Sequence, residues 1–136
     1  MPESADRRED ARRRHEMNAA ARRLEAAEAQ KIIDTFVADA GARGLAPEPL
    51  RATTYSGQSV KTDKTGWYLN RRHSLAIGAD GGYYRLVVPD LGLFARLSGI
   101  KLTPEDPPLM VAANGKDGAG GALAWFLERV LEGRRA

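Results

Sequence analysis

The chain has 136 residues, 43% of them hydrophobic and 29% charged, which is the composition of one soluble globular domain with a short appendage. It has no cysteine, which excludes disulfides, zinc–thiolate sites and thiol catalysis. No apolar run approaches the roughly 18 residues of a membrane span, and the N-terminus lacks the apolar core of a secretory signal. We therefore expect a cytoplasmic protein with no membrane contact.

The net charge of +3 is unevenly distributed. Residues 1–28 hold seven arginines (7, 8, 12, 13, 14, 22 and 23) and seven acids (3, 6, 9, 10, 16, 25 and 28), whereas residues 29–136 hold 14 basic and 11 acidic side chains. A nucleic-acid footprint is usually an unbalanced basic stripe. The arginine run at residues 12–14 is matched by neighbouring acids, which favours a solvated helix face over a phosphate-binding one.

Residues 4–41 are predicted to form one long helix, because glycine and proline are missing from residues 3–40. The second half carries a stripe that a core would bury: Ala29, Ile32, Ile33, Phe36, Val37 and Ala40. The first half has only a heptad seam of four residues, Met17, Ala20, Leu24 and Ala27. This heptad seam indicates either a frayed, solvated extension or a candidate oligomer seam completed by a partner chain. We accordingly divide the chain into a charged helical extension (1–28) and a single α+β domain (29–136).

The middle of the chain reads as antiparallel strands. Strands are predicted over 50–56, 67–70, 74–78 and 83–88, with a polar hairpin connection or loop over 57–65 and a turn at 71–73. Asp80-Gly81 predicts a two-residue hairpin turn, since this pair readily adopts the positive φ angles required.

Strict alternation then assigns the side chains of these strands to two faces. The face packed under helices would hold Trp67, Leu69, Leu75, Ile77, Tyr84, Leu86 and Val88. The opposite, solvated face would hold Tyr68, Ala76, Gly78, Tyr83, Arg85 and Val87.

The remaining elements are short. We expect a helical turn within 90–98, strands at 99–103 and 109–113, a glycine loop at 114–121, and a final amphipathic helix over 122–132 that Gly133 ends. The fold class is therefore α+β: a long N-terminal helix, an antiparallel sheet of four to six strands, and a C-terminal helix packed on one sheet face.

No motif indicates catalysis, a metal or a cofactor, and we lean against an enzyme. His15 and His73 have no ligand or nucleophile at a suitable spacing. The glycine loop before the final helix resembles a phosphate cradle, but Asp117 follows Gly115-Lys116 where a Walker A loop needs Ser or Thr. It stays an alternative site for a small molecule or phosphate.

One group of side chains suggests a binding surface: Tyr68, Tyr83 and Arg85 on the solvated face, with Arg71, Arg72 and His73 at its edge. Aromatic and arginine side chains on a sheet can stack single-stranded nucleic acid. They equally suit a protein-docking patch, and cross-strand tyrosine packing gives the same pattern.

Several short motifs resemble those of small hypothetical proteins of actinobacteria, namely residues 66–69, 75–78, 80–81, Tyr84 and 107–109. The resemblance covers roughly residues 29–131 and implies no activity, cofactor or partner. The sequence thus favours a non-catalytic cytoplasmic binding or adaptor module that acts through protein–protein contacts, either as a homo-oligomer through its first helix or with another protein. Single-stranded nucleic-acid binding is the alternative.

Overall fold

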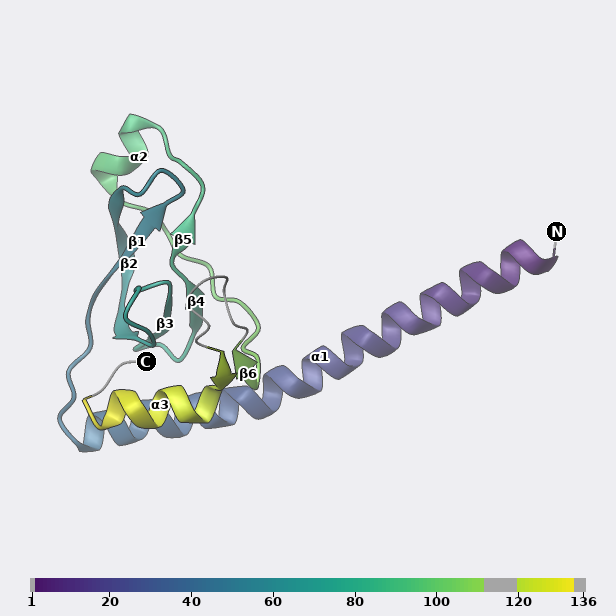
Figure 1. Cartoon of the computed structure of the whole chain (residues 1–136), viewed down its shortest axis with the longest axis horizontal. Coiled ribbons are helices and arrows are strands. Elements are labelled where there is room, and N and C mark those ends of the chain that lie inside the picture. The colour runs from purple at the N-terminus through teal and green to yellow at the C-terminus, as the bar shows by residue number, and fades with distance from the viewer. Residues whose placement is uncertain (1, 112–119, 134–136) are drawn as a thin grey trace.

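The computed structural model describes residues 2–111 and 120–133 and is α+β, as the sequence predicts (Figure 1). In chain order the elements are α1 (Pro2–Ala42), β1 (Glu48–Thr54), β2 (Ser59–Tyr68), β3 (Leu75–Gly78), β4 (Tyr83–Arg85), β5 (Val87–Val88), α2 (Leu93–Ser98), β6 (Met110–Val111), β7 (Gly121–Ala122) and α3 (Leu123–Leu131). None of the helices within these ranges has both the length and the apolarity needed to cross a membrane.

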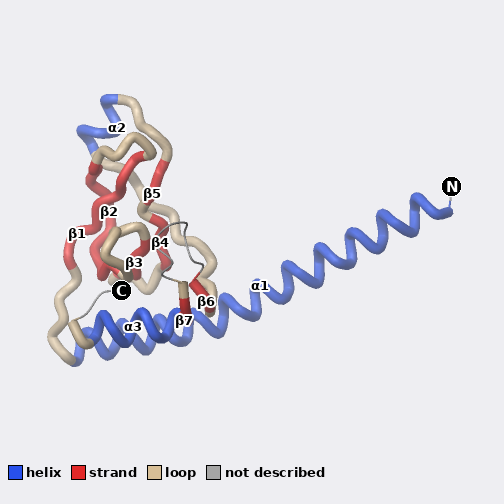
Figure 2. Tube along the Cα trace, in the orientation of Figure 1, coloured by secondary structure: helices blue, strands red, loops and turns tan. Residues whose placement is uncertain are grey.

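Helices α1 and α3 lie side by side against one face of the sheet (Figures 1 and 2). The apolar stripe of α1 makes this contact, and the part of α1 before it projects away from the domain as an isolated rod. Gly44 ends α1, with φ at 69°. Its N–H donates to the Gly41 carbonyl, and the Leu45 N–H donates to the Ala40 carbonyl. Gly133, at φ 78°, ends α3 in a similar way, so both predicted helix ends are confirmed.

The sheet closes on itself. Its strand order is β4-β3-β2-β1-β5, antiparallel except for the parallel pair β1–β5. The two outermost strands are successive parts of one extended segment, separated by Leu86 alone. The Leu86 N–H donates to the Ser74 carbonyl at 2.8 Å, and the Leu86 carbonyl accepts from the Thr53 N–H at 2.7 Å. One residue therefore joins both ends of the sheet.

Closure gives the protein two cores instead of one. The outer core lies between the sheet and the helices and includes Ile33, Phe36, Trp67, Ile77 and Phe126. Phe36 meets the Trp67 ring edge-to-face, with centroids 5.3 Å apart. The inner core fills the closed sheet and comprises Leu50, Tyr68, Ala76, Tyr84, Leu86 and Leu102, with Ile100 packed against it. The expectation of a solvated second face is therefore wrong.

The face assignment of the tyrosine pair is also wrong, and the turn explains why. Gly78 N–H bonds the Gly82 carbonyl and Gly81 N–H bonds the Gly78 carbonyl, so three residues, 79–81, connect the strands. Only Gly81 has a positive φ here, at 84°. Compared with the predicted two-residue turn, the pairing shifts by one residue, so Ile77 faces Tyr83 and Ala76 faces Tyr84. Tyr83 thus joins the outer core and Tyr84 the inner one.

The other differences concern polar or short segments. The predicted loop at 57–65 is mostly strand, because β2 begins at Ser59 and pairs with β1 at residues 59–61 and 65–66. Its inward positions include Thr62 and Lys64, whose polar groups have partners within the fold. The side chains of β2 therefore alternate between inward and outward, but polar residues occupy inward positions, so the hydrophobic pattern of a strand is missing. Segment 99–103 forms a single bridge at Ile100, and the strand expected at 109–113 is seen at 110–111. Most of the glycine loop at 114–121 lies outside the described residues.

Close contact between β2 and β3 gives a stability prediction. A Cβ added at Gly66 would lie 2.0 Å from the Ile77 carbonyl oxygen, a backbone atom that cannot move alone. Gly66→Ala should lower the free energy of unfolding by about 2–4 kcal/mol, as overpacking against fixed atoms does. Gly41→Ala is the matched control, because it adds the same methyl group in α1 with nothing within 4 Å. It should raise stability by about 0.5–1 kcal/mol through helix propensity. Urea unfolding measures both, and equal effects would contradict the contact.

Candidate functional site

The structure divides the binding group suggested by the sequence. Tyr68 lies inside the closed sheet with 5% of its surface exposed, while Tyr83 lies on the outer core with 6% exposed. The predicted grouping of Tyr68, Tyr83 and Arg85 on one exposed face is therefore wrong. The two rings present no common platform on which nucleic-acid bases could stack.

Both the hydroxyl and the ring of Tyr68 have partners within the fold. Its hydroxyl accepts the Arg51 N–H at 2.9 Å, at the point where the β1–β2 register shifts between Pro49 and Arg51. Its ring stacks on His73, with centroids 3.8 Å apart and planes at 8°. The buried tyrosine thus accepts a hydrogen bond from the Arg51 N–H, at a point where the register shift disrupts the ladder between β1 and β2.

The predicted turn at residues 71–73 is confirmed and is held by Asn70. The Asn70 carboxamide accepts the Ser74 N–H and donates to the Ser74 hydroxyl, at 3.0 and 2.7 Å. His73 closes the turn with φ 57°, the one positive φ among described non-glycine residues. It is half-buried, whereas Arg71 and Arg72 are exposed at the tip. Of the predicted group, the structure therefore brings His73 together with Tyr68 and leaves Arg71 and Arg72 at the exposed tip.

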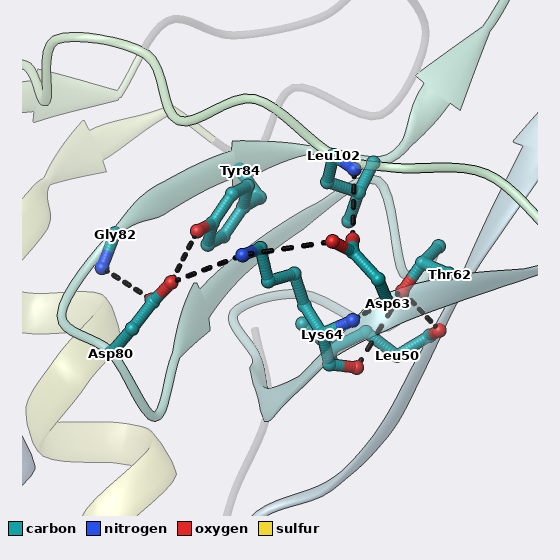
Figure 3. A network of polar contacts seen from close by, with 8 residues as sticks. All are labelled: Leu50, Thr62, Asp63, Lys64, Asp80, Gly82, Tyr84 and Leu102. Carbon is teal, nitrogen blue, oxygen red and sulfur yellow. Dashed lines mark hydrogen bonds and ion pairs between the residues drawn. The ribbon is translucent and has the colours of Figure 1, made fainter.

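A polar network links the β3–β4 turn to β2 (Figure 3). The Tyr84 hydroxyl donates to the Asp80 carboxylate at 2.5 Å, the Gly82 N–H donates to the same carboxylate, and Lys64 lies 3.6 Å from it. Lys64 also lies 3.8 Å from the Asp63 carboxylate, which accepts the Leu102 N–H at 2.9 Å. Three separate segments of chain, at residues 63–64, 80–84 and 102, therefore meet around two carboxylates and one ammonium group.

These contacts shift the pKa values in opposite directions. Burial alone would raise the pKa of the Asp80 carboxyl, but the hydrogen bonds from Tyr84 and Gly82 and the Lys64 charge outweigh it, so the pKa is lowered. Burial, followed by the Asp80 hydrogen bond and charge, raises the pKa of the Tyr84 hydroxyl. Asp80 is thus a carboxylate and Tyr84 a neutral donor at neutral pH. Tyr84 is 1% exposed, and its hydrogen bond to Asp80 fastens the turn to the inner core.

A cavity of about 500 Å³ lies beside Tyr83 and Arg85. Arg85 and Glu105 both line it and form an ion pair at 3.3 Å. The sequence interpretation missed Glu105 and the other lining residues outside β4, because they come from segments that only the fold brings together. The one available signal was the pair of adjacent acids in the stiff segment 103–108.

The heptad seam is exposed on the projecting part of α1. Met17 and Leu24 have 68% and 72% of their surfaces exposed, and Ala20 and Ala27 are exposed as well. At about 100° per residue, these four lie on the side of the helix opposite the stripe that contacts the domain. The seam is therefore accessible along its whole length.

No family model, curated protein or solved structure matches the chain. Among residues 2–111 and 120–133, no three histidine, aspartate or glutamate side chains form a group that could hold a metal ion. The function must therefore be inferred from the surfaces themselves.

The polar network predicts a pH-dependent effect of Asp80→Asn. Because the folded-state pKa of Asp80 is lowered, its stabilisation is present above the unfolded pKa of about 4 and is lost as pH falls through the folded value. We expect a loss of about 1–2 kcal/mol in unfolding free energy at pH 7, shrinking towards zero below about pH 3.

Urea unfolding at both pH values measures this difference. Asp39→Asn, in an exposed position on α1, is the control and should change little at either pH. An equal loss for Asp80→Asn at neutral and acidic pH would show that its effect is steric.

Proposed function

We propose that this chain is a non-catalytic cytoplasmic binding module that associates through the heptad seam of α1, with a second copy of itself as the partner. The observation that carries the proposal is the exposure of Met17 and Leu24 on a helix that extends well beyond its own domain. Large apolar side chains placed singly need no explanation, but two at heptad spacing on a bare helix suit helix pairing.

Charge supports self-association. Residues 1–28 carry seven arginines and seven acids, so two copies do not repel each other through net charge. Consider a parallel coiled coil with Met17 and Leu24 at the core a positions. Glu9 would then face Arg14 of the other copy, and Arg23 would face Glu28 of the other copy. Such flanking pairs of opposite charge favour one orientation and one partner.

Geometry permits the pairing as well. The seam lies opposite Ala29 and Ile33, which contact the domain, so the two domains would sit on the outer sides of a helix pair without collision. Two heptads are short, and we expect a weak dimer that forms at high micromolar concentration. The nucleic-acid alternative has less support, because Tyr68 and Tyr83 are buried on opposite faces.

Light scattering of the full chain between about 10 μM and 1 mM tests the proposal across the range expected for weak association. The mass should rise towards that of a dimer. Leu24→Glu should raise the dissociation constant at least tenfold, roughly the effect of placing an unpaired charge in a buried seam.

Ala11→Glu is the matched control. It adds the same charge on the side of the exposed helix that faces away from the seam, so it should leave the dissociation constant nearly unchanged. A monomer mass at every concentration would refute the proposal. So would equal weakening by both variants, since the seam would then play no special part.

A further inference from the structure

The Tyr83 cavity contains a tyrosine hydroxyl that is open to the cavity. Tyr83 is 6% exposed, and its hydroxyl makes no hydrogen bond with any residue in the described part of the chain. Burial raises its pKa to about 12, against a lowering effect of Arg85, so the hydroxyl stays neutral at physiological pH. Arg129 Nε is the only fully buried side-chain polar atom without a partner in the described chain, so the Tyr83 hydroxyl is within reach of solvent. Since Tyr83 lines the cavity, a bound molecule can form a hydrogen bond with this hydroxyl in place of water.

The rim of the same cavity collects exposed apolar surface. Tyr55, Val87 and Met110 are 70%, 41% and 63% exposed, and all three line it. They belong to the turn after β1, to β5 and to β6, so the fold alone brings them together. Convergence of large apolar side chains around a hollow of ligand size is typical of binding sites.

Charge decides the kind of ligand. Arg85 is already paired with Glu105, whereas the Asp106 carboxylate has no cationic partner among the residues that the structure describes. The described lining residues thus carry one unbalanced negative charge in a protein whose net charge is +3. The exposed Tyr55 ring adds an aromatic face of the kind that attracts cations.

From these observations we propose that the Tyr83 cavity binds a small organic cation, an amine carried on an apolar or aromatic body. The ammonium group pairs with Asp106, the Tyr83 hydroxyl oxygen is available to an N–H donor, and the apolar body covers Val87 and Met110. This site is independent of self-association, because none of its described lining residues lies on α1.

Phenethylamine is a suitable probe, because it combines a primary ammonium group with one aromatic ring. We expect a dissociation constant in the low millimolar range, as for other ligands of this size. In a ¹⁵N-NMR titration of the full chain, the amides of Tyr83, Val87 and Met110 should shift and saturate together. 3-Phenylpropionate has the same ring and the opposite charge, and it should bind at least about fivefold more weakly.

Two variants connect the binding to named groups. Asp106→Asn should weaken phenethylamine binding about fivefold, the effect of losing one exposed ion pair. Tyr83→Phe keeps the ring and should weaken binding about threefold to fivefold, the effect of losing one hydrogen bond. Asp10→Asn, on the projecting part of α1, removes the same charge elsewhere and should leave binding unchanged. Circular dichroism verifies that each variant is folded.

Three outcomes would overturn the proposal. The first is a lack of shifts at these amides up to about 20 mM phenethylamine, well above the expected dissociation constant. The second is binding of 3-phenylpropionate as tight as that of the amine. The third is equal weakening by Asp106→Asn and Asp10→Asn, which would show that the probe responds to net charge and not to the cavity.

Discussion

Closure of the sheet at Leu86 is the constraint on which the rest of the structure depends. Leu86 bonds Ser74 through its N–H and Thr53 through its carbonyl, so the segment 83–88 is paired to β3 at one end and to β1 at the other. Open edges of a sheet invite pairing with other chains, and closure removes them. It also creates an enclosed interior that helices cannot reach. The outer face alone is then left for α1 and α3, which explains the two separate cores.

An enclosed interior restricts which polar groups can enter it. Tyr68 and Tyr84 both lie there, and each hydroxyl has a defined partner, the Arg51 N–H for one and Asp80 for the other. Both rings thereby fill the inner core. The Tyr68 hydroxyl bonds the β1–β2 register shift, and the Tyr84 hydroxyl bonds the β3–β4 turn. Tyr83 differs, because its ring is buried on the outer face and its hydroxyl has no hydrogen-bond partner in the described chain. Among the three central tyrosines, Tyr83 is the one that lines this cavity.

Local signals predicted the parts of the fold that depend on neighbouring residues. The uninterrupted helix over 4–41, the amphipathic stripe of α3 and the stop at Gly133 each depend on residues a few positions apart, and all are confirmed. The register of the β3–β4 hairpin was missed, since two-residue and three-residue connections differ by one residue yet reverse every face. Closure and the Tyr83 cavity were beyond prediction, because they join segments such as Tyr55, Val87 and Met110 that share no sequence pattern. The outcome for the heptad seam is different: the sequence locates it and the structure leaves it exposed.

Packing of the domain also explains how the projecting part of α1 can form a helix with few tertiary contacts. The first turn is the costly step in forming a helix, while each added residue costs little. The buried contacts of Ala29, Ile33, Phe36 and Ala40 with the sheet and α3 supply that first step. From there the helix can extend towards the N-terminus through a sequence rich in alanine, glutamate and arginine, in which Glu9 and Arg13 form an ion pair. The heptad seam is therefore held in helical form by the outer core, and a partner that binds it need not supply the entropy of ordering it.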